Sequence, residues 1–300
     1  MDDSSGRARP LEPTSTSVQN ALASSTLPDI PHVLIESEES GVQLNLGDLW
    51  AYRELLYFLT LRDIKVRYKQ TLMGAVWVLI QPLMTMLIFT LIFNKFARLD
   101  TKDIPYPLFA YSGLLLWNFF SNAVTTGTYS LVNNSHLVTK VYFPRVFIPA
   151  AAVGAGLVDL GIASLLLIAL AIYYGVNPSW GALLIPLVVL LAAMLALGAG
   201  MLVSALTVKY RDLRHALPFV MQFWMFASPV IYPTNIVPEQ WRWILLVNPM
   251  TGILEGFRAA LTNQAFDWTM LAISAVAATT LLAGAFYVFR GLEDTFADVI

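Results

Sequence analysis

The chain has 300 residues, of which 57% are hydrophobic and 13% are charged. Soluble globular domains carry about 25% charged residues, so the composition excludes ordinary soluble domains and indicates an integral membrane protein. The net charge of −2 excludes a generally basic nucleic-acid binder, and the lack of cysteine excludes disulfides, thiolate nucleophiles and thiolate metal sites.

Residues 1–45 are predicted to form a disordered cytoplasmic tail. The stretch up to residue 40 is rich in Ser, Thr, Pro and Glu and has no sustained apolar period. No apolar core follows Arg7 and Arg9, so this segment lacks the pattern of a signal peptide. We therefore expect the amino terminus to stay in the cytoplasm and the membrane domain to occupy residues 46–300.

The segment that begins at residue 46 is predicted to be a helix lying in the plane of the membrane interface. Its apolar side chains share one arc of the helical wheel, with Arg53 as the one intruder. Residues on that arc are Leu46, Leu49, Trp50, Leu56, Tyr57 and Leu61. Trp50 and Tyr57 are expected at the depth of the lipid headgroups. The alternative is that the segment forms the cytoplasmic start of a long first helix.

Six apolar runs follow, judged against the roughly 20 residues that cross a bilayer as a helix. They cover approximately residues 72–94, 108–129, 146–174, 180–205, 216–232 and 268–289. Residues 233–267 hold two short helical patterns separated by Asn248 and Pro249, which suits two short helices that enter the outer leaflet and return. The expected fold is an all-α integral membrane protein with six transmembrane helices, an N-terminal interfacial helix and an outer re-entrant helical hairpin between helices five and six.

Basic residues predict the orientation of these spans. Lys and Arg concentrate in the loops on one side, which include Lys140, Arg145, Lys209 and Arg211. The positive-inside rule places that side, and with it both termini, in the cytoplasm.

Four blocks of sequence occur in a fixed order along the chain. They are residues 61–77 with the following Gln81-Pro82-Leu83, residues 133–145, residues 209–213 and residues 228–232, and the Asn248-Pro249 pair follows them. Together they resemble the membrane subunit of ABC exporters for O-antigen, teichoic acid and related polysaccharides. The resemblance covers about residues 46–290 and implies an ABC exporter transmembrane domain over residues 46–300.

This resemblance implies a half-transporter in the bacterial inner (cytoplasmic) membrane. Two copies of the chain, a homodimer, would form the pathway, and two copies of a separate ABC ATPase subunit would drive it. The implied cargo is an O-antigen-like polysaccharide linked to polyprenyl pyrophosphate, with membrane lipids as further partners and no nucleic acid.

The chain has no phosphate-binding loop of the form G-x-x-x-x-G-K-[ST], so we expect no cofactor on this chain and assign ATP and Mg to the partner ATPase. By resemblance, the ATPase contacts lie in the interfacial helix, at Trp50 and Arg53, and in the loop that holds Asn134, Ser135 and His136. These three residues are expected to begin a short helix parallel to the membrane. The alternative is a loop that merely turns the chain around.

A dense basic run, formed by Arg62, Lys65, Arg67 and Lys69, precedes the first span. Its simplest interpretation is a positive-inside anchor. A pyrophosphate headgroup at the cytoplasmic leaflet also needs cations at this depth, and Arg offers bidentate phosphate geometry. Both roles are compatible, so the four residues are candidates for binding the pyrophosphate.

Aromatic side chains are candidates for lining a sugar pathway, because aromatic rings can stack against the C–H faces of sugars. Three lie on one face of the second predicted span and three on one face of the fifth, where Trp224 is adjacent. With Trp77 of the first span, the candidates are Phe109, Trp117, Phe120, Phe219, Phe223, Trp224 and Phe226. The alternative is core packing or an interfacial aromatic belt.

Two further features of the spans have different interpretations. Asp159 lies near the middle of the third span, where an unpaired carboxylate is costly. It is either a polar point in the pathway or a coupling element, or else a carboxylate bonded within the bundle. No basic residue in the spans is an obvious partner. Small residues recur every fourth position on the fourth span and predict a close helix-packing surface, formed by Ala192, Ala196, Gly200 and Ser204.

The outer hairpin is interpreted as a gate that closes the conduit from outside. Its candidate residues are Trp241, Trp243, Asn248, Pro249 and Phe257. Glu255 and Arg258 are expected to pair on its wet face. The alternative is a rigid plug that only completes the bundle.

Two other functions remain open from the sequence. One is an ABC permease of the same fold that exports lipids or small drugs. The other is a membrane-embedded enzyme that acts on lipid-linked sugars, which requires an acid/base or metal constellation. The carboxylates and histidines show no such spacing, so no catalytic and no metal-binding residue is predicted.

Overall fold

The computed structural model describes residues 50, 52–69, 75–96, 101, 104–140, 143–176, 180–262 and 264–299. The chain divides after residue 41, and the described residues all belong to the second unit, residues 42–300. The predicted tail, residues 1–45, and the first apolar positions of the predicted interfacial helix, Leu46 and Leu49, lie outside the described residues. All secondary structure in the described ranges is helical, which confirms the predicted all-α class.

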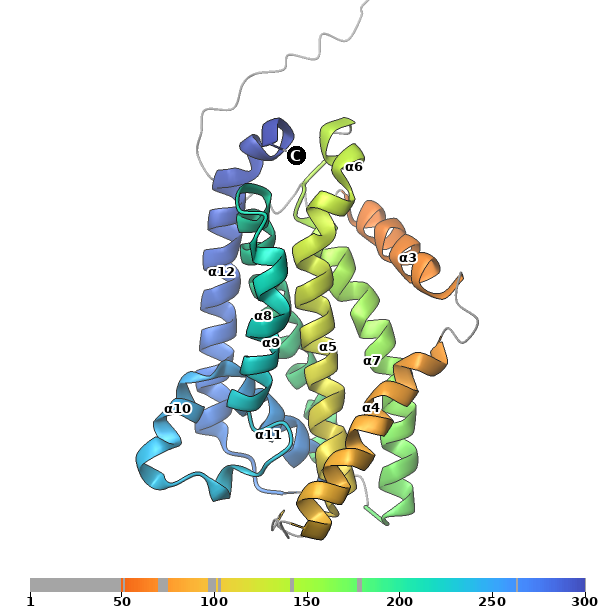
Figure 1. Cartoon of the computed structure of the whole chain (residues 1–300), viewed down its shortest axis with the longest axis vertical. Helices are drawn as coiled ribbons and strands as arrows, with labels where there is room; N and C mark the ends of the chain where they lie inside the picture. The colour runs from red at the N-terminus through yellow and green to blue at the C-terminus, as the bar shows by residue number, and fades with distance from the viewer. Residues whose placement is uncertain are drawn as a thin grey trace, which may run out of the picture. The chain divides into compact units, whose positions relative to one another are not determined.

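The helices follow one another along the second unit (Figure 1). The α-helices are α3 (Arg53–Lys69), α4 (Ala75–Phe89), α5 (Tyr106–Asn133), α6 (Ser135–Lys140), α7 (Phe147–Tyr173), α8 (Ile185–Lys209), α9 (Leu213–Ala227), α10 (Arg242–Val247), α11 (Pro249–Thr262) and α12 (Trp268–Val299). Shorter elements are the π-helix η1 (Thr90–Phe96) and the 3-10 helices η2 (Trp180–Leu184), η3 (Thr234–Ile236) and η4 (Glu239–Trp241).

Helix α5 is the centre of the packing (Figure 1). It contacts α7 and α8 over most of its length and also touches α4, α9 and α11. Every residue from 108 to 117 is buried. A helix enclosed by its neighbours does not need an apolar side chain at every position, which explains why α5 tolerates the buried Ser112 and the half-buried Asn118.

Four helical segments are long and apolar enough to cross a membrane. They are Val76–Phe93, Phe147–Tyr173, Trp180–Lys209 and Trp268–Glu293, and the bent pair Glu239–Val247 and Pro249–Thr262 makes five if it is one span. The two other predicted spans correspond to α5, which is long but carries more polar residues, and to α9, which has only 15 residues. By length and composition alone, the described helices therefore give four or five candidate spans and not the six that were predicted.

The predicted packing stripe on α8 is confirmed. Ala192, Ala196, Gly200 and Ser204 are all buried. A Cβ atom built on Gly200 would lie 3.7 Å from the Cα atom of Gly127 on α5, so the two backbones approach closely.

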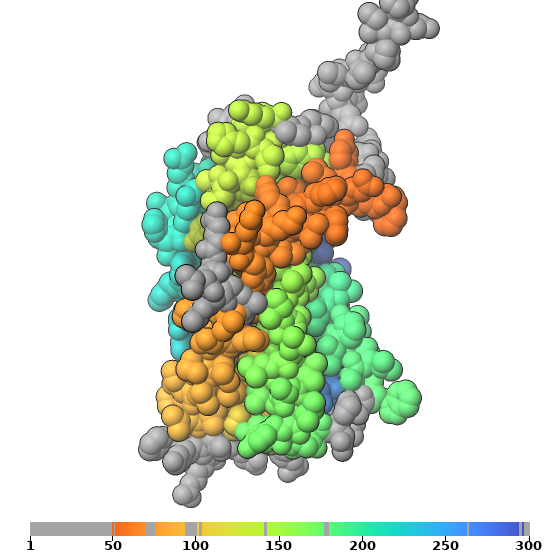
Figure 2. All heavy atoms as spheres, turned by 90° about the vertical axis from the view of Figure 1, so that its right-hand side faces the viewer, coloured from red at the N-terminus to blue at the C-terminus, as the bar shows by residue number. Residues whose placement is uncertain are grey.

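The predicted interfacial helix has different limits in the structure. Helix α3 continues through the whole basic run to Lys69, and α4 is a separate helix that begins at Ala75. Figure 2 shows α3 (orange) lying across the face of the molecule to which α7 (green) and α4 (amber) also contribute. The apolar arc near residue 46 underestimated the length of α3, because Lys and Arg are good helix formers and extend the helix beyond its apolar stripe.

Helices α6 and α10 lie at opposite ends of the helix bundle (Figure 1). The end with α6 also holds the C-terminal part of α12, where the backbone N–H of Arg145 donates to Glu293 Oε1 at 2.9 Å. A second cluster of buried side chains stabilises this end, including Leu59, Val138, Phe289 and Phe296.

Candidate functional site

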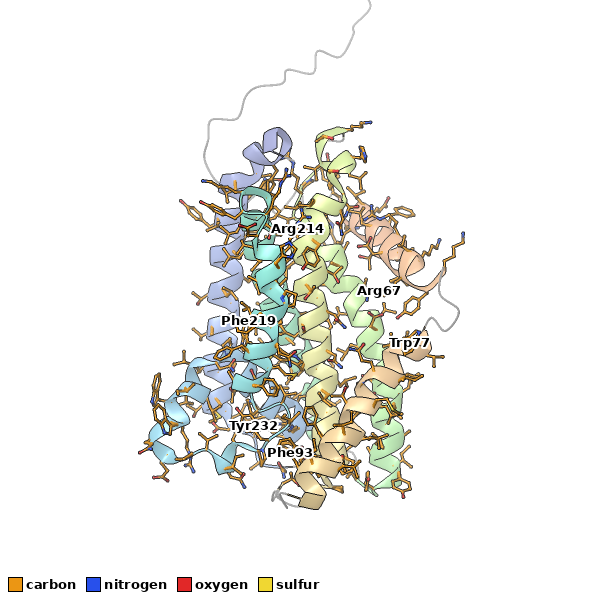
Figure 3. The ribbon with its side chains drawn as sticks, in the orientation of Figure 1. Arg67, Trp77, Phe93, Arg214, Phe219 and Tyr232 are labelled. Carbon is orange, nitrogen blue, oxygen red and sulfur yellow. The ribbon has the colours of Figure 1, made fainter. Side chains whose placement is uncertain are left out.

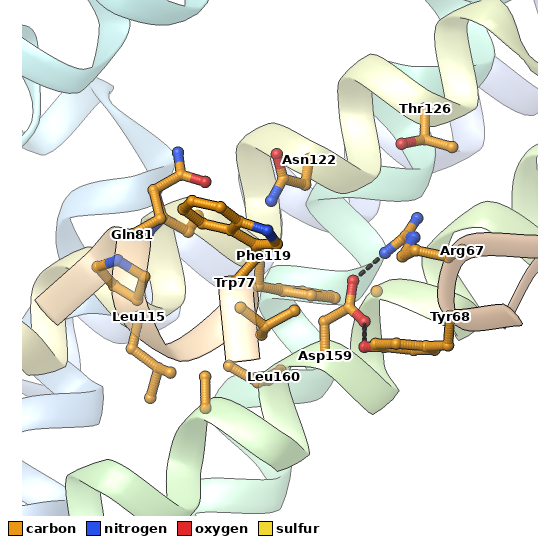
Figure 4. Close-up of a pocket in the computed structure, with 15 residues that line it drawn as sticks. Arg67, Tyr68, Trp77, Gln81, Leu115, Phe119, Asn122, Thr126, Asp159 and Leu160 are labelled. Carbon is orange, nitrogen blue, oxygen red and sulfur yellow. Dashed lines mark hydrogen bonds and ion pairs between the residues drawn. The ribbon is translucent and has the colours of Figure 1, made fainter. Parts of the chain in front are cut away.

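A cavity of about 390 Å³ opens between α3, α4, α5 and α7. Residues from all four helices line it (Figure 4). The polar and aromatic part of the lining, with the adjoining backbone of α4, consists of Arg67, Tyr68, Trp77, Val78, Gln81, Pro82, Asn118, Asn122, Thr126 and Asp159. Its size lies within the range typical of small-molecule sites, which is about 300–1,000 Å³.

One side of this cavity is formed by a charged cluster of Asp159 on α7 with Arg67 and Tyr68 on α3. The two carboxylate oxygens of Asp159 accept hydrogen bonds from the Arg67 guanidinium and the Tyr68 hydroxyl (Figure 4). Burial raises the pKa of Tyr68 and outweighs the lowering effect of Arg67, so this hydroxyl keeps its proton as the donor. The carboxylate is thus paired and hydrogen-bonded, as a poorly solvated charge requires.

This pair gives Asp159 a basic partner, for which the spans themselves offered no obvious candidate. The partner comes from the helix before the first span, so a search restricted to the spans missed it. Arg67 and Asp159 are 92 positions apart in sequence, and no local pattern connects them. The structure agrees with the interpretation of Asp159 as a carboxylate bonded within the bundle, and the same carboxylate lines the cavity.

The wall opposite the charged cluster is polar but neutral. Asn118, Asn122 and Thr126 follow one another at intervals of four on α5 and therefore share a face. With Gln81 on α4 they line the cavity, and none of these four side chains has a hydrogen-bond partner among the described residues. The interval of four was visible in the sequence, but the sequence analysis did not single it out.

Trp77 is the pathway candidate that lines this cavity, and its side chain is largely exposed. Figure 3 shows Trp77 at the start of α4 and Arg67 near the end of α3, on the same side of the bundle. The remaining aromatic candidates lie elsewhere.

The aromatic candidates of α5 are packed inside the chain. Phe109, Trp117 and Phe120 are buried, and Trp224 of α9 makes T-shaped ring contacts with Trp117 at 6.5 Å and with Phe120 at 5.0 Å. These contacts correspond to the core-packing alternative. The other α9 candidates are exposed, with 74% of Phe219, 68% of Phe223 and 51% of Phe226 accessible.

Two residues of the basic run form ion pairs and two do not, within the described part of the chain. Arg62 pairs with Asp63 at 2.8 Å, and Arg67 pairs with Asp159. Lys65 and Lys69 are exposed and form no ion pair within the described part of the chain. The two lysines are therefore the cations best placed to meet an added phosphate.

Arg258 in the outer hairpin differs most from its expected place. Its guanidinium donates to Glu255 Oε1 at 3.1 Å, as the spacing predicted, but the arginine is only 2% exposed. It also donates to the carbonyls of Pro229 at 2.7 Å and Val230 at 2.6 Å. The expected wet-face pair is wrong, because these carbonyls after α9 draw the guanidinium into the protein.

The other gate candidates of the hairpin fall into two groups, one bonded or buried within the protein and one exposed. Asn248 accepts from Trp224 Nε1 at 3.0 Å and donates to Ser228 Oγ at 2.8 Å, and Phe257 is buried. Trp241 and Trp243 are exposed. Asn248 lies between α10 and α11, and its hydrogen bonds attach it to the end of α9. These contacts favour the alternative in which α11 is part of a rigid plug and not a moving gate.

The candidates for ATPase contact lie at the end of the bundle that holds α6. The short helix expected after Asn134 is present as α6, with Ser135 as its first residue and His136 exposed. Asn134 Nδ2 donates to the Ser130 carbonyl at 2.8 Å and so also caps α5. The Arg53 guanidinium carbon lies 5.2 Å from the centroid of the exposed Trp50 ring, which gives a cation–π contact.

Several apolar helices packed around α5 define a multi-pass helical membrane protein. Residues 54–262 match the family model described as the ABC-2 type transporter, and the chain belongs to this family.

Relatives of known name cover most of the chain. It is 32% identical to the O-antigen export system permease protein RfbA of Myxococcus xanthus, over 84% of this chain and 98% of that protein. It is 27% identical to the protein of the same name from Klebsiella pneumoniae, over 86% and 98%. The polysialic acid transport protein KpsM of Escherichia coli is 24% identical, over 67% and 79%.

Proposed function

We propose that this chain is the transmembrane subunit of an ATP-driven exporter that carries a polyprenyl-pyrophosphate-linked, O-antigen-like polysaccharide across the bacterial inner membrane. The observation that carries the proposal is the similarity to O-antigen export permeases over 98% of their length, at 32% and 27% identity. Similarity to a polysialic acid transport protein supports the wider class of polysaccharide cargo.

The proposed topology has six membrane-crossing segments and both termini in the cytoplasm. Helix α5 counts as a span because it has 28 residues and is largely buried among its neighbours, and α9 counts with the turn that follows it. The α10–α11 pair, bent by 95°, acts as the re-entrant hairpin, since an open backbone at this depth requires protein around it. Asn248 Oδ1 accepts from the backbone N–H of Met250 in this pair, and the side chains of Arg258 and Asn248 bind the pair to the turn after α9.

The proposed assembly is two copies of this chain with two copies of an ABC ATPase. The sequence has no phosphate-binding loop of its own, so ATP and Mg belong to the partner. Helix α6 and the exposed Trp50–Arg53 pair are the proposed contacts with the ATPase. The exposed face of α9, formed by Phe219, Phe223 and Phe226, is the proposed aromatic surface of the pathway.

The proposed site for the cargo's pyrophosphate is the basic part of α3. Arg62 and Arg67 already pair with carboxylates, so Lys65 and Lys69 supply the first contacts with the phosphates. Two exposed cations on a helix in the interface fit an anionic headgroup.

Deletion of the gene in its own bacterium tests the proposal. We expect the polymer to disappear from the cell surface and to accumulate inside on its lipid carrier, and the wild-type chain to restore export. Unchanged surface polymer in the deletion strain would contradict the proposal. A loss of some exported lipid or drug with normal surface polymer would favour the permease alternative, and an internal polymer of altered structure would favour the enzyme.

A further inference from the structure

We propose that the cavity between α3, α4, α5 and α7 is a binding site for one neutral sugar unit of the cargo. This inference rests on the proposed function, because the polymer supplies the sugar. It adds a saccharide site inside each protomer, distinct from the exposed aromatic face of α9. The charge, the hydrogen-bonding groups and the aromatic ring that line the cavity all fit a neutral sugar.

The charge of the cavity wall is balanced. Among the described residues that line it, Arg67 and Asp159 are the only ionisable groups apart from the Tyr68 hydroxyl, and they pair with each other. A phosphate requires donors or cations that are free to meet it. Because the guanidinium is already occupied by a carboxylate, the cavity favours an uncharged ligand.

The hydrogen-bonding groups of the wall match hydroxyls. The amides of Gln81, Asn118 and Asn122 each offer donors and an acceptor, and the Thr126 hydroxyl offers both. A sugar hydroxyl likewise donates and accepts, so it can satisfy these groups in either direction. An acyl chain offers neither, and it would leave four polar side chains without partners at considerable cost.

The backbone of α4 adds another free acceptor to the wall. Pro82 lies inside α4 and has no N–H to donate to the carbonyl of Val78, four residues earlier. Both residues line the cavity. The indole of Trp77 adds an apolar ring surface, against which the C–H face of a pyranose can pack.

Protection from labelling tests occupancy directly, since the chain has no cysteine of its own. The Asn122→Cys variant of the full exporter is labelled with a membrane-permeant maleimide in cells that make the polymer and in cells that lack its first sugar transferase. We expect labelling to be several-fold slower in the cells that make the polymer. The Glu239→Cys variant, at a side chain that is 88% exposed in the outer hairpin, should label equally in both strains.

Equal labelling of the Asn122→Cys variant in both strains would overturn the proposal, because the cargo then does not enter the cavity. Absence of labelling in both strains would overturn it as well, since a closed cavity cannot admit a sugar.

Export by matched variants gives the second readout. The Asn118→Leu/Asn122→Leu variant should export roughly ten-fold more slowly at normal protein levels, because two hydrogen bonds to the sugar are lost. The Thr126→Val variant should slow export, whereas Thr125→Val, the same change one position earlier on α5 and outside the cavity lining, should not.

The two proposals fail differently. If the wild-type chain does not restore surface polymer to the deletion strain, the proposed function is wrong. If it does, and the cavity variants export normally, only the sugar site is wrong.

Discussion

Arg258 connects three parts of the hairpin end of the bundle through one fully buried guanidinium. It joins Glu255 of α11 to the carbonyls of Pro229 and Val230, and its guanidinium carbon lies 3.7 Å from the centroid of the Phe109 ring on α5. Desolvation of such a charge is compensated only while all its partners are present. Removing it therefore leaves a carboxylate and two carbonyls without their donor.

The Arg258→Leu variant should lose about 3–5 kcal/mol of stability, the usual cost of breaking a buried pair. Arg242→Leu is the matched control, since Arg242 and Glu239 form the same kind of pair at 3.5 Å but are 50% and 88% exposed. Exposed pairs contribute little, so the control should be near neutral. Thermal unfolding of the purified variants in detergent measures both, and equal midpoints would contradict the buried role of Arg258.

Gly113 on α5 gives the Arg258 cluster its space. A Cβ atom there would lie 2.2 Å from the Val230 carbonyl oxygen and 2.4 Å from Arg258 Nη2. Gly113→Ala should therefore cost about 1–3 kcal/mol through overpacking. Gly161→Ala on α7, where nothing lies within 4 Å, should be neutral or stabilising. Thermal unfolding of both variants in detergent tests this prediction. An unchanged unfolding midpoint for Gly113→Ala would show that the turn after α9 does not lie against Gly113.

At the scale of elements, α3 is fastened to α7 along its length. Thr60 packs against Gly154, and Arg67 and Tyr68 bind Asp159. A Cβ built on Gly154 lies 3.7 Å from the Thr60 Cβ, which suits a disulfide. The Thr60→Cys/Gly154→Cys variant should oxidise and lose both thiols, as mass spectrometry after alkylation would show. Thr60→Cys/Gly161→Cys should keep both, and the reverse pattern would contradict this packing.

The exposed aromatic face of α9 can be tested for a role in transport. Replacing Phe219, Phe223 and Phe226 together with Leu should leave stability unchanged, because the rings are exposed, but should slow export several-fold if sugars slide along them. Phe120→Leu should do the opposite and lower the unfolding temperature, because Phe120 is fully buried. Normal export by the triple variant would remove α9 from the pathway.

Sequence periodicity predicted the apolar helices well and the contacts between helices poorly. The third predicted span, 146–174, matches α7 within one residue at each end, because a long apolar run in which Asp159 is the only charged residue has the length and composition of a membrane-crossing helix. The pairing of Arg67 with Asp159 was not predictable, since it joins residues 92 positions apart. Burial of Arg258 was missed because a Glu and an Arg three residues apart usually mark a helix surface.

For the whole molecule, the described contacts connect one end of the bundle to the other. Helix α6 and the C-terminal part of α12 form the end proposed to meet the ATPase, and the hairpin forms the opposite end (Figure 1). Helix α5 runs between them and contacts α6, α7, α8, α9 and α11. Helix α5 is therefore the element that connects the end proposed to meet the ATPase with the cavity and with α9.

ATP-driven movement of the polymer is tested most directly in proteoliposomes that contain this chain and its ATPase, with the ATPase facing outward. The lipid-linked polymer is added to the outer leaflet, and its protection from an added glycosidase is followed with time. We predict that protection rises only when ATP and Mg are present and both subunits are included. Polymer that stays accessible in the presence of ATP, or becomes protected without the ATPase, would contradict the proposal that this chain is the membrane half of a polysaccharide exporter.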